Sequence, residues 1–160
     1  MHKPFIENIR LGQTFLARLM PGDDVFEKLK EILSHKGLER VVILSAIGSL
    51  REVSFRDLKE GISLPVDLEK THLIEREGPF EVLSLEGNVV PMEEEPVIHL
   101  HALLGTPEGG VIGGHLFGGK VFSTLEIVFA EISGSRVVKH RSEVTHLTEM
   151  SIGEGESERL

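Results

Sequence analysis

Three histidines within a short glycine-rich stretch have the spacing of a metal site. His99 and His101 are two residues apart, so on a β-strand both imidazoles leave the same face. Residues 106–110, Thr-Pro-Glu-Gly-Gly, have the composition of a turn. If the chain folds back near Glu108, His115 lies opposite His101, with the two Cβ atoms about 4.5–5.5 Å apart. Three imidazoles that converge in this way suit a divalent transition metal.

Several roles remain open for these residues and for the nearby carboxylates. A His-x-His pair alone is more often structural than ligating, but a third opposed histidine completes a known zinc arrangement with an open fourth position. Glu126 lies in an apolar run, where a carboxylate is costly unless it is paired or coordinated. It could orient a ligand histidine, act as a general base, or form a salt bridge at a subunit interface. The acidic run 93–95 could add a ligand but is more typical of a solvated surface.

One helix is predicted, over residues 24–35. Asp24 is placed to cap its N-terminus, apolar residues recur at helical spacing through the segment, and Gly37 fits the stop. The apolar stripe of this helix should cover a sheet.

The rest of the chain has the alternation typical of strands separated by short turns. Strand follows strand, so we expect an α+β fold: a mainly antiparallel sheet of eight or nine strands covered by one main helix. Residues 48–49 should end or bend a strand, turns are expected at 78–79 and 118–119, and a last strand is expected within 136–147. We predict one compact domain over residues 1–148 and a disordered acidic tail over 149–160.

Composition excludes several classes of protein. The chain has 17 Lys and Arg against 26 Asp and Glu, a net charge of −9, which disfavours general binding of nucleic acid. Cysteine is absent, so there is no disulfide framework and no thiolate site. The sequence has neither an apolar run long enough to span a membrane nor a signal peptide at its start, so we expect a cytoplasmic protein. Few Asn and Gln beside many charged residues resemble thermophile composition.

Two motifs resemble a known family. Residues 78–87, Gly-Pro-Phe-Glu-Val-Leu-Ser-Leu-Glu-Gly, are similar to the Gly-x-Phe-Glu-Ile-Leu-Ser-Leu-x-Gly signature of the plants-and-prokaryotes conserved (PPC) domain. The pair His99 and His101, followed by Gly-Gly-His ending at His115, resembles the prokaryotic stand-alone form of that domain. The resemblance covers residues 13–148, nearly the whole chain.

The resemblance implies an antiparallel α+β fold, assembly as a homotrimer, and a metal, zinc, held by the three histidines. Plant members carry AT-hook segments built on Arg-Gly-Arg-Pro, which bind AT-rich DNA, and this sequence has no such segment. DNA binding, which the family label suggests, therefore stays open, with either DNA itself or a DNA-associated protein as the partner, although the charge of the chain does not support direct binding.

Two functions follow from these observations, beside DNA binding, which only the family name favours. The first is a metal-binding homotrimer that acts in binding or regulation. The second is a zinc-dependent hydrolase or hydratase that uses metal-bound water, with Glu126 as its general base. They differ in one structural feature, since an enzyme needs a coordination position open to solvent.

Overall fold

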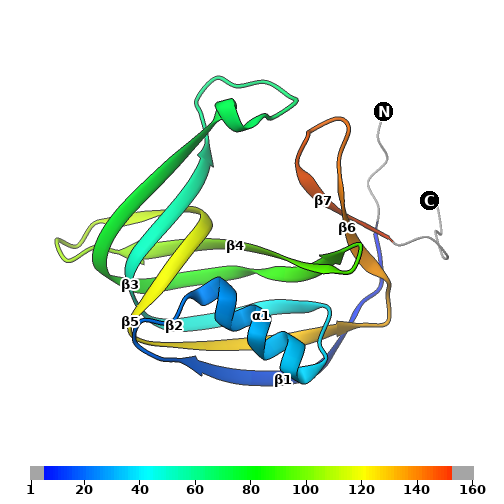
Figure 1. The fold of residues 1–160 in the computed structure, drawn as a ribbon, viewed down its shortest axis with the longest axis horizontal. Helices are drawn as coiled ribbons and strands as arrows, with labels where there is room; N and C mark the ends of the chain where they lie inside the picture. The colour runs from blue at the N-terminus through cyan, green and yellow to red at the C-terminus, as the bar shows by residue number, and fades with distance from the viewer. Residues whose placement is uncertain (1–5, 153–160) are drawn as a thin grey trace.

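The computed structural model of the protein describes residues 6–152 and shows one antiparallel fold with a single α-helix (Figure 1). Its elements are β1 (Arg10–Leu19), α1 (Val25–Lys36), β2 (Val41–Leu58), the 3-10 turn η1 (Leu68–Lys70), β3 (Thr71–Met92), β4 (Glu95–Gly105), β5 (Val111–Ser133), β6 (Val137–Arg141) and β7 (Thr148–Ile152). The mainly antiparallel class and the single domain are confirmed. The described residues form seven strands, so the predicted eight or nine was wrong.

The strand count differs because glycines bend the long strands instead of ending them. The turns expected at 78–79 and 118–119 lie inside strands, in β3 and β5, and residues 48–49, expected to end or bend a strand, lie inside β2 at a shift of its register with β5. At Gly48, where φ is 152°, a Cβ would lie 2.1 Å from the Thr124 carbonyl oxygen. The missing side chain therefore lets β2 cross β5 closely while the two strands stay paired.

The main sheet closes on itself around the core. Its strand order is β1-β5-β2-β3-β4, and β4 also pairs with the beginning of β5. Strand β5 therefore pairs with β2 along one edge, and with β4 and then β1 along the other. This closure joins the hairpin with the histidines to the end of β2.

Helix α1 forms where the sequence predicted it. The Asp24 side chain accepts hydrogen bonds from the backbone N–H groups of Phe26 and Glu27, and Gly37 ends the helix in a left-handed conformation. Its buried residues are one turn apart and join the buried residues of the sheet in one core; they are Val25, Leu29 and Leu33. Within residues 6–152, no helix is both long enough and apolar enough to span a membrane.

The segment after β5 forms a separate two-stranded ribbon. The predicted last strand, 136–147, is β6 followed by a turn, and β7 pairs back on β6. Residues 149–152 of the predicted tail belong to β7, while residues 153–160 lie outside the described residues.

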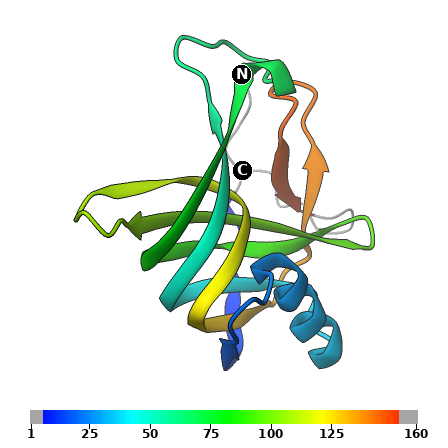
Figure 2. The ribbon, with the colours of Figure 1, turned by 60° about the vertical axis from the view of Figure 1, so that its left-hand side comes forward.

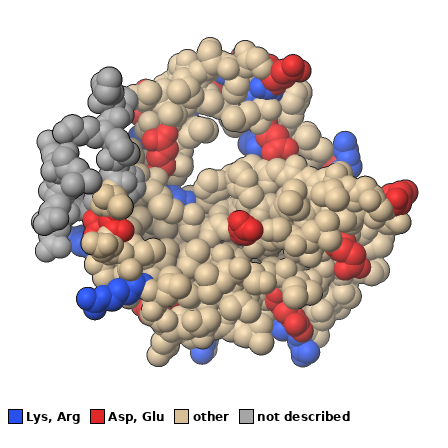
Figure 3. Space-filling view, turned by 180° about the vertical axis from the view of Figure 1, so that it is seen from behind, with Lys and Arg blue, Asp and Glu red and all other residues tan. Residues whose placement is uncertain are grey.

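The ribbon reaches a long loop of the main sheet and forms an arch with it. We use the word arch for residues 59–70, between β2 and β3, together with residues 142–147, between β6 and β7. Strand β4 runs below the arch in both ribbon views (Figures 1 and 2). The space-filling view shows an opening under the arch (Figure 3).

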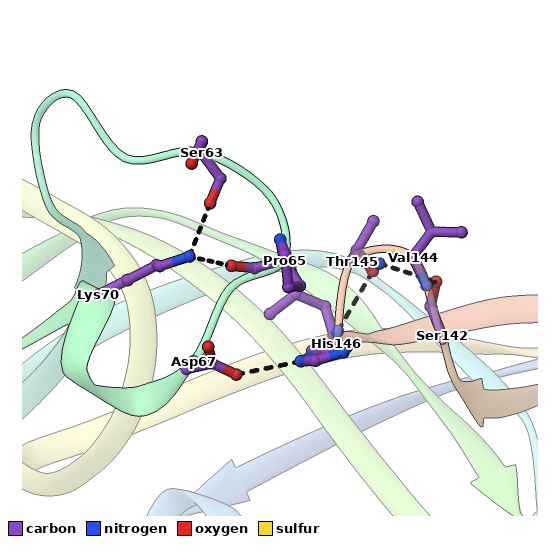
Figure 4. A network of polar contacts seen from close by, with 9 residues as sticks. Ser63, Pro65, Asp67, Lys70, Ser142, Val144, Thr145 and His146 are labelled. Atoms are coloured by element: carbon purple, nitrogen blue, oxygen red, sulfur yellow. Dashed lines mark hydrogen bonds and ion pairs between the residues drawn. The ribbon is translucent and has the colours of Figure 1, made fainter.

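Polar contacts hold the two halves of the arch together (Figure 4). The Val66 N–H donates to the Thr145 carbonyl oxygen at 2.8 Å, and His146 Nδ1 lies 3.0 Å from Asp67 Oδ1. Lys70 Nζ donates to two loop carbonyls, those of Ser63 and Pro65. The ribbon carrying β6 is thereby tied to the loop that follows β2.

Candidate metal centre

The hairpin expected between residues 97 and 115 is present, and its register brings the histidines together. His99 and His101 lie on the outer face of β4, because Leu100, which lies between them, and Ala102, which follows them, are buried in the core. In the pairing of β4 with β5, His101 is directly opposite His115. The predicted opposition of these two residues is confirmed.

The three imidazoles form one cluster. Their ring centroids are 4.9–5.3 Å apart, and the Nε2 atoms of His99 and His101 are 3.2 Å apart. One nitrogen from each ring can be chosen so that all three lie within 4.8 Å of one another. We call these three residues the histidine cluster.

The donor set fits a tetrahedral divalent metal. Zinc–nitrogen bonds of 2.0–2.1 Å at tetrahedral angles place ligand nitrogens about 3.3 Å apart. The 3.2 Å separation in the His99–His101 pair is close to that value. Neutral imidazole is a preferred ligand of zinc and other late transition metals.

Electrostatics keep two of the rings neutral. Burial lowers the pKa of His99 to about 4, and the positive charge of Lys139 contributes, followed by the other two histidines. Burial, and then His101, also lower the pKa of His115. Neutral rings leave a nitrogen lone pair free at pH 7, so a metal would not have to displace protons from them.

Close backbone contacts fix the strands that carry the cluster. The His115 N–H donates to Asp57 Oδ1 at 2.9 Å, which ties β5 to the end of β2. At Gly87, on β3, φ is 151° and a Cβ would lie 2.0 Å from the His99 carbonyl oxygen. The glycine thus lets β3 approach the backbone of β4 directly at a candidate ligand.

Besides Asp57, two residues near the cluster were missed from the sequence. Lys139 on β6 is 4% exposed, and burial lowers its pKa to about 8. Asn88 is directly opposite His99, and its Oδ1 is buried with no hydrogen-bond partner among the described residues. Neither has a sequence signal of its own, because Lys139 lies in a short basic run and Asn88 in an ordinary strand.

The structure does not bring Glu126 to the histidine cluster. It lies exposed toward the other end of β5, opposite Arg18 of β1 and Ile47 of β2. The acidic run 93–95 is also exposed, at the turn between β3 and β4.

A cleft of about 490 Å³ lies apart from the cluster, between β2, β3 and β5. Its charged residues include Glu75 and Glu77, and it contains an ion pair in which Lys120 Nζ is 2.8 Å from Glu52 Oε2. None of the three histidines lines it.

The structure has a closed antiparallel sheet with three histidines on a β-hairpin, and comparison with known proteins shows the family to which it belongs. The chain belongs to the Plants and Prokaryotes Conserved (PCC) domain family, whose profile matches residues 7–133. This is the family that the two sequence motifs resemble, so that interpretation is confirmed.

Two solved structures are similar over most of their length. A plant- and prokaryote-conserved (PPC) protein of Pyrococcus horikoshii is 30% identical with a TM-score of 0.76, covering 88% of this chain and 92% of its own. A metal-containing protein of Archaeoglobus fulgidus is 33% identical with a TM-score of 0.74, covering 88% and 94%.

Curated relatives are much longer than this chain. The chain is 31% identical over 141 residues to the bifunctional protein GlmU of Synechococcus sp. (strain JA-3-3Ab). The matched region covers 88% of this chain but 20% of GlmU. The chain therefore spans about a fifth of this relative's length.

Proposed function

We propose that this chain is a metal-binding member of its family, in which His99, His101 and His115 hold one divalent transition metal, with zinc as the first candidate. The observation that carries the proposal is the convergence of three imidazole nitrogens within 4.8 Å on one outer face of the sheet. The relative from Archaeoglobus fulgidus, described as a metal-containing protein, supports it.

Three protein ligands leave a coordination position for another ligand. The His101 ring is exposed, so the cluster is accessible from solvent. A metal held here supplies a Lewis-acidic position to which a further molecule can bind. We propose that the protein works by binding or regulation at this position, within an oligomer.

Self-association is proposed on the outer face of β1, β5 and β2. Leu16 and Ile47 are each 71% exposed there, next to the directly opposed Arg18 and Glu126. An apolar surface of this kind, broken by opposite charges, suits an interface between copies of the chain. The homotrimer implied by the family resemblance would bury it, and Glu126 would then serve as an interface residue.

A hydrolase or hydratase is the second candidate, and the solvent-accessible coordination position is the observation in its favour. Because Glu126 lies away from the cluster, a general base would have to be another group. This candidate therefore has less support than metal binding itself.

Direct DNA binding has little support from the charge of the chain. The net charge is −9, and on the face seen in Figure 3 Lys and Arg are interspersed with Asp and Glu rather than gathered in a patch. A DNA-associated protein is a better proposal than DNA itself for any partner of that kind.

Elemental analysis of metal per chain tests the proposal. We expect about one metal per chain in the wild type and in the control His35→Ala, which removes an exposed histidine at the end of α1, and almost none in His101→Ala. Absence of metal from the wild type, even after incubation with zinc and removal of excess, would overturn the proposal.

A further inference from the structure

Lys139 is a buried ammonium group with no counter-ion among the described residues. Its side chain projects from β6 and is 4% exposed. Within residues 6–152 its Nζ makes one hydrogen bond, to the Val97 carbonyl oxygen at 3.4 Å, and no ion pair within 4.0 Å. A lysine ammonium has three N–H donors, so two are left without a partner. Burial of a lysine in this state is costly, and buried lysines are nearly always paired.

The unpaired ammonium lies beside the histidine cluster. Val97 precedes His99 by two residues on the same strand, and the charge of Lys139 acts on both His99 and His115. Asp57 and Arg56 also act on His115, from β2, so they and the three histidines are the other charged or titratable groups of this region.

The Asp57 carboxylate does not neutralise Lys139. It accepts the hydrogen bond from the His115 N–H and forms no ion pair with the lysine. A divalent metal on three neutral imidazoles would add two further positive charges to this region. The combined charge of metal and ammonium would favour an anion placed between them.

We propose that the open coordination position binds a small carboxylate. One of its oxygens would bind the metal, while the other accepts a hydrogen bond from Lys139 Nζ. This inference rests on the proposed metal site and adds the chemical class of its ligand. Carboxylates fit because their two oxygens can contact both positive groups, the metal and the ammonium, at once.

Lys139 then makes the site select anionic ligands over neutral ones. A neutral ligand such as imidazole can fill the same coordination position but gains nothing from the ammonium. Removal of the lysine should therefore weaken binding of an anion and leave binding of a neutral ligand unchanged.

Cobalt-substituted protein provides the assay, because the visible absorption of Co²⁺ responds to a fourth ligand. The probes are acetate and imidazole, titrated into the wild type, into Lys139→Met and into the control Lys30→Met, an exposed lysine of α1. We expect Lys139→Met to weaken acetate binding about tenfold or more, as for loss of a charge-assisted hydrogen bond. Imidazole binding, and both affinities in Lys30→Met, should stay within about twofold of the wild type.

Metal content measured on the same samples separates the two proposals. A wild type that takes up no cobalt overturns the metal site and this inference with it. If cobalt is bound at full content but acetate affinity is the same in the wild type and Lys139→Met, the inference alone is overturned.

A second measurement covers the case in which Lys139→Met does not fold. In zinc-loaded wild type labelled at lysine, acetate should shift the side-chain resonance of Lys139, saturating with the acetate concentration, and leave that of Lys30 in place. An unchanged Lys139 resonance at saturating acetate would also overturn the inference.

Discussion

Substitution of Gly87 by alanine should damage both the fold and the histidine cluster. Gly87 is on β3, and a Cβ built there would lie 2.0 Å from the His99 carbonyl oxygen and 2.9 Å from its carbonyl carbon. These are backbone atoms of a paired strand, so no side chain can rotate away to make room. Strand β4 would have to move by about 1 Å at a candidate ligand, since real Cβ atoms essentially never come within 3.0 Å of such atoms.

Two terms contribute to the expected loss of stability. The positive φ of 151° is strained for alanine, at about 1–3 kcal/mol, and the steric contact adds about 1–3 kcal/mol of overpacking. We therefore expect Gly87→Ala to lower the free energy of unfolding by about 3 kcal/mol or more. For a chain of this size that corresponds to a fall in Tm of about 6–12 °C.

The matched control is Gly61→Ala. Gly61 has a positive φ of 70°, but nothing lies within 4 Å of its Cβ position. This variant should show the backbone strain alone, about 1–2 kcal/mol, without the contact. Urea unfolding of both variants measures the difference, and zinc titration should show at least about tenfold weaker binding in Gly87→Ala only, because ligand distances tolerate about 0.2 Å. Equal destabilisation and equal zinc affinity in the two variants would refute the proposed link between β3 and the cluster.

Two further predictions concern the oligomer and the effect of pH. Ile47→Glu, on the proposed interface, should shift the mass measured by light scattering from a trimer toward a monomer, whereas Leu68→Glu in the arch, equally exposed at 73%, should not. An unchanged mass for Ile47→Glu would argue against that face. In metal-free protein the free energy of unfolding should fall as pH drops from about 6.5 to about 4, because folded His99, with a pKa of about 4, binds fewer protons than the unfolded chain. After allowance for solvent screening the loss is about 1–2 kcal/mol, and urea unfolding across this range should show a flatter profile in His99→Gln.

Local chemistry allowed much of the fold to be predicted. The cap at Asp24 and the stop at Gly37 set the limits of α1 within one residue at either end. The turn at residues 106–110 and the alternation before it set the histidine register correctly. Strand number was wrong because a glycine in a sequence indicates backbone freedom, and only the partner strand determines whether the chain uses it to turn or to cross a neighbour closely.

The three clustered histidines were predictable because they depend on one hairpin, whose pairing is local. Lys139 and Asp57 were not, because they come from β6 and β2, and their approach to the cluster depends on how the sheet closes. At Glu126 the apolar run left three roles open, and the fold places this residue away from the cluster. That run lies partly on an outer face where Leu16 and Ile47 are also exposed, so alternation indicated a face without showing whether the core or another molecule covers it.

Lys139 has opposite effects on the two species that we propose for this site. Its charge helps to keep His99 neutral and ready to bind a metal, but the same charge repels a cation held by the cluster. A bound carboxylate would offset this repulsion, because it attracts both positive groups. Affinities for metal and carboxylate should therefore be coupled, each raising the other by the same factor as linkage requires. In Lys139→Met, metal binding without acetate should become stronger, while the increase in metal affinity that acetate causes should become smaller. The site would then be built to retain the metal best when its anionic ligand is present.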